Sequence, residues 1–195
     1  SLDDDPEALR ARYAGLGRRH AEMGLPLPPF LKGADILHEQ LLEVLVHATR
    51  EPSVLRDTQR FFASLRDLMA RGYLEKAVPA ARAELAGLRS GAAGAALGLE
   101  GREAAFACLD GLLSGSERHL ETGATASPAG AAACQAARWL DVQTAAGRAH
   151  SALHGDAESL AFFLSRAEYA AVFPILEGLL GRFHRLLLNR APGAR

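Results

Sequence analysis

Apolar residues recur at three- and four-residue spacing through most of the chain, the periodicity of an amphipathic α-helix. The first helix is predicted to start at Asp5-Pro6, a typical N-cap and first helical residue, and to stop at Gly24. Its apolar face carries Leu9, Tyr13, Leu16 and His20. The proline-rich segment 25–29 is predicted to be a stiff connector, because proline lacks an amide hydrogen and disfavours helical geometry in the residue before it.

The same periodicity predicts further helices over about 30–50, 53–89, 100–113, 130–154 and 159–189, the last of them one long or interrupted helix. Pro79 marks a kink or a boundary within the third of these segments. No alternating β-pattern of useful length occurs, so we predict an all-α fold, a helical bundle that forms one unit or two packed helical subdomains. The small-residue run 90–96 predicts a junction between an N-terminal region, 1–90, and a C-terminal bundle, 97–190.

Composition narrows the class of protein. Hydrophobic residues make up 49% of the chain and aromatic residues only 6%, so the apolar content is mostly Ala and Leu. The charges, 22 basic and 23 acidic, are spread along the sequence and offer no footprint for nucleic acid. No apolar run approaches the roughly 20 residues of a membrane-spanning helix. Only Cys108 and Cys134 occur, which favours reduced thiols and a cytoplasmic location.

Motifs for catalysis are missing from the sequence. It has no Gly-rich phosphate loop, no nucleophile elbow, no Cys-x-x-Cys pair and no His-Glu-x-x-His helix. We therefore predict that the chain is not an enzyme.

Histidines are the remaining candidates for chemistry. His20 lies on an apolar helix face, from which an imidazole can reach a buried cofactor; a partly buried histidine bonded to a carbonyl or to water is the alternative that spacing favours. His150 and His154, four residues apart, would face one side of a helix and could share a metal. The alternative there is a solvated helix end at Gly155-Asp156.

Cys134 and His184 are candidate metal ligands, since thiolate and imidazole suit zinc. A lone buried cysteine is otherwise a small hydrophobe. The three other histidines, His38, His47 and His119, show no partnered spacing and are predicted to lie on the surface.

The stretch Leu16-Gly17-Arg18-Arg19-His20-Ala21-Glu22-Met23-Gly24-Leu25-Pro26-Leu27-Pro28, continued by Leu31-Lys32-Gly33-Ala34-Asp35-Ile36-Leu37, resembles the proximal-histidine segment of bacterial globin-coupled sensors. The resemblance implies that His20 is the haem-ligating histidine. Only 19 residues precede His20, whereas a sensor globin places several helices before this point, so the helices after Pro52 would have to complete a haem pocket.

The second half resembles the helical bundle of chemoreceptor zinc-binding domains, which also occurs beside diguanylate cyclase domains. The family pattern is a His-x-x-Trp helix, a Cys-x-x-Gly-x-Trp helix and a last helix with His-x-x-x-His. Cys134-Gln135-Ala136-Ala137-Arg138-Trp139-Leu140 matches the second element in its cysteine and tryptophan, and His184 matches the last. The other two ligand positions are replaced, by Ala105 and Leu180, which implies a bundle that has kept its shape and lost its metal unless His119, His150 or His154 substitutes.

Together these resemblances imply the sensory, linker and dimerisation region of a bacterial signalling protein, which regulates a diguanylate cyclase output domain linked beyond Arg195. The apolar stripes predicted to form a homodimer are Leu37, Leu41, Val44 and Leu45 on the second helix and Leu176, Leu180 and Leu187 on the last. Core packing explains the same stripes equally well. The alternatives are a haem sensor that uses His20 and a zinc sensor that uses Cys134, His184 and further histidines.

Overall fold

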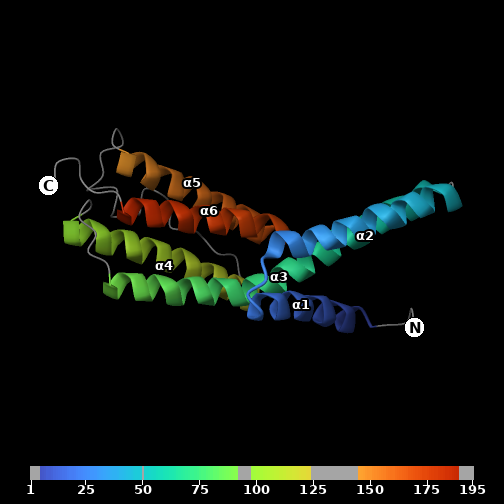
Figure 1. Ribbon diagram of the computed structural model, residues 1–195, viewed down its shortest axis with the longest axis horizontal. Coiled ribbons are helices and arrows are strands. Elements are labelled where there is room, and N and C mark those ends of the chain that lie inside the picture. The colour runs from blue at the N-terminus through green and yellow to red at the C-terminus, as the bar shows by residue number, and fades with distance from the viewer. Residues whose placement is uncertain (1–4, 50, 92–97, 124–144, 189–195) are drawn as a thin grey trace. The chain divides into compact units, whose positions relative to one another are not determined.

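The computed structural model describes residues 5–49, 51–91, 98–123 and 145–188, and these form six α-helices and no strand (Figure 1). The helices are α1 (Pro6–Glu22), α2 (Leu27–Ala48), α3 (Pro52–Gly91), α4 (Gly98–Thr122), α5 (Ala145–Ser165) and α6 (Tyr169–Leu188). The predicted all-α fold is confirmed. None of the described helices combines the length and the apolar character needed to cross a membrane.

The chain forms two compact units, residues 1–77 and residues 78–195, and the division falls within α3. Most of the predicted junction, residues 92–96, lies outside the described residues, so the boundary after residue 90 stays a prediction.

Both ends of α1 are capped as the sequence predicts. The Asp5 carboxylate accepts a hydrogen bond from the Glu7 amide at 3.1 Å, and Pro6 is the first helical residue. At the other end Gly24 has a φ of 68°, a left-handed conformation that glycine adopts without strain. The Gly24 amide donates to the Ala21 carbonyl and the Leu25 amide to the His20 carbonyl, each at 3.0 Å. These two bonds form a Schellman motif, which ends the helix.

Prolines behave differently from the prediction. Instead of extending the connector to residue 29, Pro28 and Pro29 occupy the first turn of α2, where amide hydrogens have no partner within a helix. Pro79 lies inside α3, which continues to Gly91, so a helix boundary at this proline is wrong, whereas a kink there stays a prediction. The division between the two compact units, after Ala77, lies two residues before it. The buried stripe continues across that proline at helical spacing through Leu74, Val78 and Ala81, and its burial offsets the missing hydrogen bond.

The C-terminal helices also differ from their predicted limits. α4 extends to Thr122 rather than ending near residue 113, and α5 continues past its predicted limit at residue 154. The interruption that the sequence allowed within 159–189 falls at residues 166–168. Ala167 turns the chain there with a φ of 57°, and the Glu168 amide donates to the Phe163 carbonyl at 3.0 Å. Gly155 therefore lies inside α5.

In unit 1, α1 packs against α3 through two glycines. A Cβ atom on Gly17 would lie 1.9 Å from the Met69 carbonyl oxygen, and one on Gly72 would lie 1.9 Å from the Ala14 carbonyl oxygen. Ion pairs flank the crossing, Arg18 with Glu75 at 2.6 Å and Lys76 with Glu22 at 2.8 Å. The backbones approach so closely that no side chain fits between them.

In unit 2, helices α4, α5 and α6 and the last part of α3 enclose an apolar core. Phe106 and Phe183 meet edge to face at its centre, with ring centroids 5.2 Å apart. Arg82 of α3 donates to Asp110 at 3.0 Å and to Glu117 at 2.5 Å, both on α4. Other large buried side chains of this core include Leu113, Leu160, Leu164, Val172, Leu179 and Leu186.

Candidate functional site

His20 lies on α1 and stacks against Phe30 of α2. The ring centroids are 3.7 Å apart and the planes 16° from parallel. Within the described part of the chain, its Nδ1 is buried and has no hydrogen-bond partner. His20 is half-buried, as the alternative that spacing favoured expects. Haem ligation by His20 stays a prediction.

Helices α2 and α3 of unit 1 form an antiparallel hairpin (Figure 1). Its inner side is closed by His38 stacked on Phe62, with centroids 4.6 Å apart, and by an ion pair of Asp35 with Arg66 at 3.2 Å. His38 is therefore half-buried, not on the surface as predicted.

One outer side of this hairpin is apolar. We call it the hairpin face and define it by Leu37, Leu41 and Val44 of α2 with Val54 and Phe61 of α3. At 100° per residue, the three α2 members lie about 60–120° around the helix axis from His38, which points inward. The two α3 members lie about 80–100° from the inward Phe62, and the rotation has the same direction relative to the chain in both helices. Because the two helices are antiparallel, both sets turn to the same side of the hairpin.

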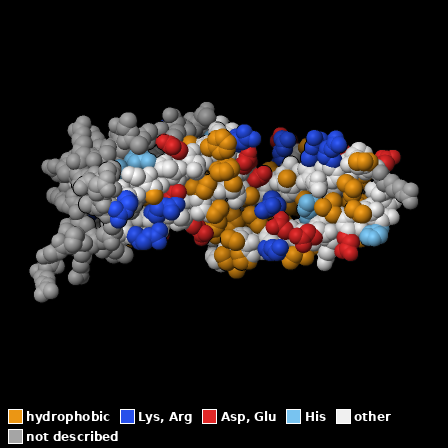
Figure 2. All heavy atoms as spheres, turned by 90° about the horizontal axis from the view of Figure 1, so that it is seen from above, with side chains coloured by type: hydrophobic (Ala, Val, Ile, Leu, Met, Phe, Trp, Pro, Cys, Tyr) orange, Lys and Arg blue, Asp and Glu red, His pale blue; other side chains and the backbone are white. Residues whose placement is uncertain are grey.

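Members of the hairpin face are exposed to an unusual degree for large apolar side chains. Exposed fractions reach 61% for Leu37, 63% for Val44 and 49% for Phe61. Figure 2 shows apolar side chains on the surface of this hairpin, toward the right of the view, among charged ones. Several large apolar side chains exposed on one side of a hairpin make that side a candidate interaction surface.

The second stripe predicted to dimerise, on α6, belongs largely to the core of unit 2. Leu176 is only 2% exposed, and Leu180 and Leu187 are half-buried. Core packing, the alternative explanation of this stripe, accounts for it.

His150 and His154 form a buried pair on α5. Their Nε2 atoms are 3.3 Å apart, and the residues are 7% and 8% exposed. The predicted solvated helix end is wrong, because α5 continues past Gly155 to Ser165. Burial lowers the pKa of both imidazoles, and the neighbouring His154 lowers the pKa of His150 further, whereas Glu158 acts to raise that of His154.

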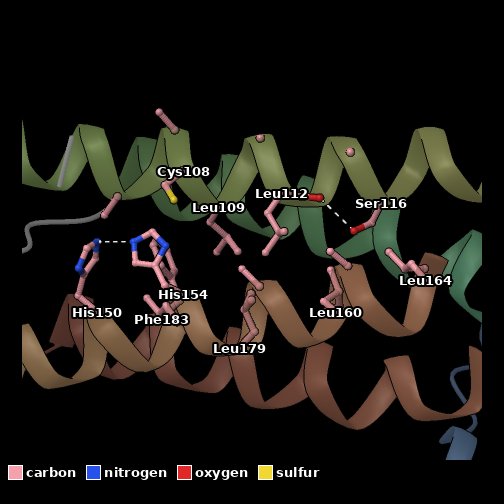
Figure 3. Close-up of a pocket in the computed structure, with 17 residues that line it drawn as sticks. Cys108, Leu109, Leu112, Ser116, His150, His154, Leu160, Leu164, Leu179 and Phe183 are labelled. Carbon is pink, nitrogen blue, oxygen red and sulfur yellow. Dashed lines mark hydrogen bonds between the residues drawn. The ribbon is translucent and has the colours of Figure 1, made fainter. Parts of the chain in front are cut away.

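A cavity of about 190 Å³ adjoins the histidine pair. Figure 3 shows the pair at one end, with Cys108 of α4 beside it, and leucines of α4, α5 and α6 along the walls. The Ser116 hydroxyl, farther along, donates to the Leu112 carbonyl at 3.0 Å. The cavity therefore offers an apolar volume with the imidazoles at one end.

The predicted zinc ligands are only partly described. His184 is half-exposed on α6, and its Nε2 lies 3.5 Å from Glu84 Oε1. Cys134 lies outside the described residues. Over the described ranges, no three His, Cys, Asp or Glu side chains group closely enough to hold a metal. Zinc binding stays a prediction.

Sequence reasoning missed the burial or position of two residues of unit 2. His119, predicted on the surface, is buried at 6% exposure, and Cys108 lines the cavity. A usable signal was present in α4, where Ala105, Cys108, Gly111 and Gly115 recur at helical spacing. Small side chains along one face leave space between packed helices.

Comparisons of the chain with protein families, with curated proteins and with solved structures give no match.

Proposed function

We propose that this chain is the sensory and dimerisation region of a bacterial signal-transduction protein, which self-associates as a homodimer and regulates a diguanylate cyclase output domain linked to it. The resemblance of segment 16–37 to globin-coupled sensors supports the class of protein. The proposal places the region in the cytoplasm. Its mechanism is transmission through helix packing: a change in the packing between two protomers alters the orientation of the attached output domains.

The hairpin face is the observation that carries the proposal. Its five side chains would lose their contact with water against the same face of a second copy, giving a four-helix arrangement of two antiparallel hairpins. Such an interface is isologous, because each protomer contributes the same residues.

Sedimentation equilibrium of the purified chain tests the dimer. The wild type is expected to sediment as a dimer at micromolar concentration, and Leu41→Glu is expected to be monomeric because each protomer would bury an unpaired carboxylate in the interface. Gln40→Glu is the matched control, since it adds the same charge to α2 one residue away, about 100° from Leu41 around the helix. A monomeric wild type at several hundred micromolar, or a dimeric Leu41→Glu, contradicts the interface.

The output domain is tested separately from the dimer. The gene product beyond Arg195 is expected to contain the Gly-Gly-Asp-Glu-Phe signature of a diguanylate cyclase. A continuation without that signature removes this part of the proposal and leaves the dimer intact.

A haem sensor is the second candidate, supported by the resemblance of segment 16–37 to the proximal-histidine segment of globin-coupled sensors and by the half-buried position of His20. It requires a Soret band after reconstitution with haem that is lost in His20→Ala. His47→Ala is the control, because His47 is exposed and its Nδ1 contacts only the Glu43 carbonyl of its own helix, at 2.7 Å. A wild type without the band excludes this candidate.

A further inference from the structure

We propose that the cavity of unit 2 is a binding site for a compact, uncharged, single-ring molecule bearing one hydroxyl group, which the His150–His154 pair holds by hydrogen bonds. This site is independent of the proposed dimer, because all of its residues belong to α4, α5 and α6 of one chain.

The size of the cavity sets the size of the ligand. An apolar cavity of about 150 Å³ lined by Leu, Ile and Phe accommodates benzene. The cavity here, at about 190 Å³, leaves room for a six-membered ring with one or two further heavy atoms. Leu109, Leu160, Leu179 and Phe183 supply the apolar walls.

The lining also sets the charge of the ligand. Its polar side chains are Cys108, Ser116, His150 and His154, and none of the lining residues is Asp, Glu, Lys or Arg. A charged ligand would lose its hydration without gaining a counter-charge, which costs several kcal/mol. Burial lowers the pKa of both histidines and so favours their neutral forms, which leaves the cavity without charge at neutral pH.

The histidine pair determines which functional group the ligand carries. Two neutral imidazoles with facing Nε2 atoms present one N–H donor and one lone pair. Their direct contact, at 3.3 Å, is long for a strong hydrogen bond. A hydroxyl replaces this direct contact when the two rings turn apart, because its oxygen then accepts from one Nε2–H while its hydrogen is donated to the other Nε2. The Ser116 hydroxyl does not offer the ligand a hydrogen-bond donor, since its hydrogen is donated to the Leu112 carbonyl.

Calorimetric titration with two isosteric probes tests the site. We expect p-cresol to bind one site per chain about fivefold more tightly than p-xylene, which replaces the hydroxyl with a methyl group and lacks the hydrogen bond. The anion p-toluate is expected not to bind.

Variants then locate the binding. His154→Leu is expected to reduce p-cresol affinity to that of p-xylene while leaving p-xylene binding unchanged, which also shows that the variant is folded. Ala157→Leu is expected to abolish binding of both probes by filling the cavity. If the circular dichroism spectrum of Ala157→Leu differs from that of the wild type, Ala161→Val replaces it as a smaller cavity-filling substitution. His184→Gln is the matched control, a histidine of the same unit that does not line the cavity.

The absence of saturable binding of both probes by the wild type overturns the proposal. Equal affinity for p-cresol and p-xylene, or p-cresol binding that survives both His154→Leu and Ala157→Leu, overturns it as well. Sedimentation of the same samples reports on the dimer independently, so failure of one proposal leaves the other standing.

Discussion

At the scale of single residues, three histidines lie where the protein holds their rings away from bulk water. His20 is held against Phe30, whereas His150 and His154 face each other beside a cavity. An imidazole changes charge near neutral pH, so its environment decides both what it binds and how stability depends on pH. These three positions respond differently to substitution.

The histidine pair makes unit 2 less stable in mild acid. Burial lowers the pKa of His150 and His154 in the folded chain, so below about pH 6.5 the unfolded chain binds more protons than the folded one. The free energy of unfolding is therefore fully retained above that pH and falls as the pH decreases toward the lowered folded values.

Urea denaturation between pH 8 and pH 5 measures this loss. The double variant His150→Leu/His154→Leu is expected to lose less stability over this range than the wild type, whereas His47→Gln, at an exposed position, should follow the wild type. Glu158, which acts to raise the pKa of His154, remains in all three proteins, as does Cys108. Identical pH profiles for wild type and double variant would contradict the assignment.

His20 is expected to carry a cost to stability that phenylalanine removes. In His20→Phe an aromatic ring can still stack on Phe30, but the buried Nδ1 without a partner is gone, so the free energy of unfolding should rise by about 1 kcal/mol. His20→Ala loses the stack and should fall below wild type by about 1–2 kcal/mol. Chemical denaturation measures both, and a destabilised His20→Phe would show that the imidazole makes a favourable contact of its own.

At the scale of helices, the crossing of α1 and α3 is the tightest contact in unit 1. It depends on Gly17 and Gly72, each of which faces backbone atoms of the other helix. Backbone cannot move aside as a flexible side chain can, so a methyl group at either position forces the helices apart.

Gly17→Ala is therefore expected to destabilise unit 1 by more than about 2 kcal/mol. Gly15→Ala is the control on the same helix: a Cβ there would meet only arginine side chains at 3.8 Å or more, and alanine favours the helix by up to about 1 kcal/mol. Thermal unfolding followed by circular dichroism compares the two. Equal midpoints for the two variants would show that α1 and α3 do not cross this closely.

Helix limits could be predicted where a local interaction decides them. The cap at Asp5-Pro6 and the turn at Gly24 involve bonds between residues at most five apart, and the sequence shows both. A helix boundary at Pro79 is wrong because the burial of Leu74, Val78 and Ala81 outweighs one missing hydrogen bond, and burial depends on neighbours that a single segment does not reveal. The break at Ala167 has no glycine or proline to mark it.

At the scale of the whole molecule, periodicity predicts that a helix has an apolar face but not whether other helices bury that face. The stripes on α2 and α6 look alike in the sequence, yet Leu176 is buried and Leu37 is exposed. The facing of His150 and His154 follows from their spacing, whereas the cavity beside them arises from the packing of three helices. The burial of each apolar face and the position of the cavity therefore depend on tertiary packing, which the sequence pattern does not reveal.

The exposed hairpin face leads to a prediction about the stability of the assembled protein. If two copies bury this face, dissociation accompanies unfolding, and the thermal midpoint rises with protein concentration by mass action. For a dimer of 195-residue chains the rise is about 2 °C for each tenfold increase in concentration. Scanning calorimetry between 5 and 500 µM, roughly the range over which such dimers exchange, measures it.

The variants used for sedimentation give this measurement its internal control. Leu41→Glu should show a lower midpoint that no longer depends on concentration, because its hairpin face carries a charge that cannot be buried unpaired. Gln40→Glu should retain the slope of the wild type. A wild-type midpoint that stays constant over the hundredfold range would contradict burial of the hairpin face between two copies.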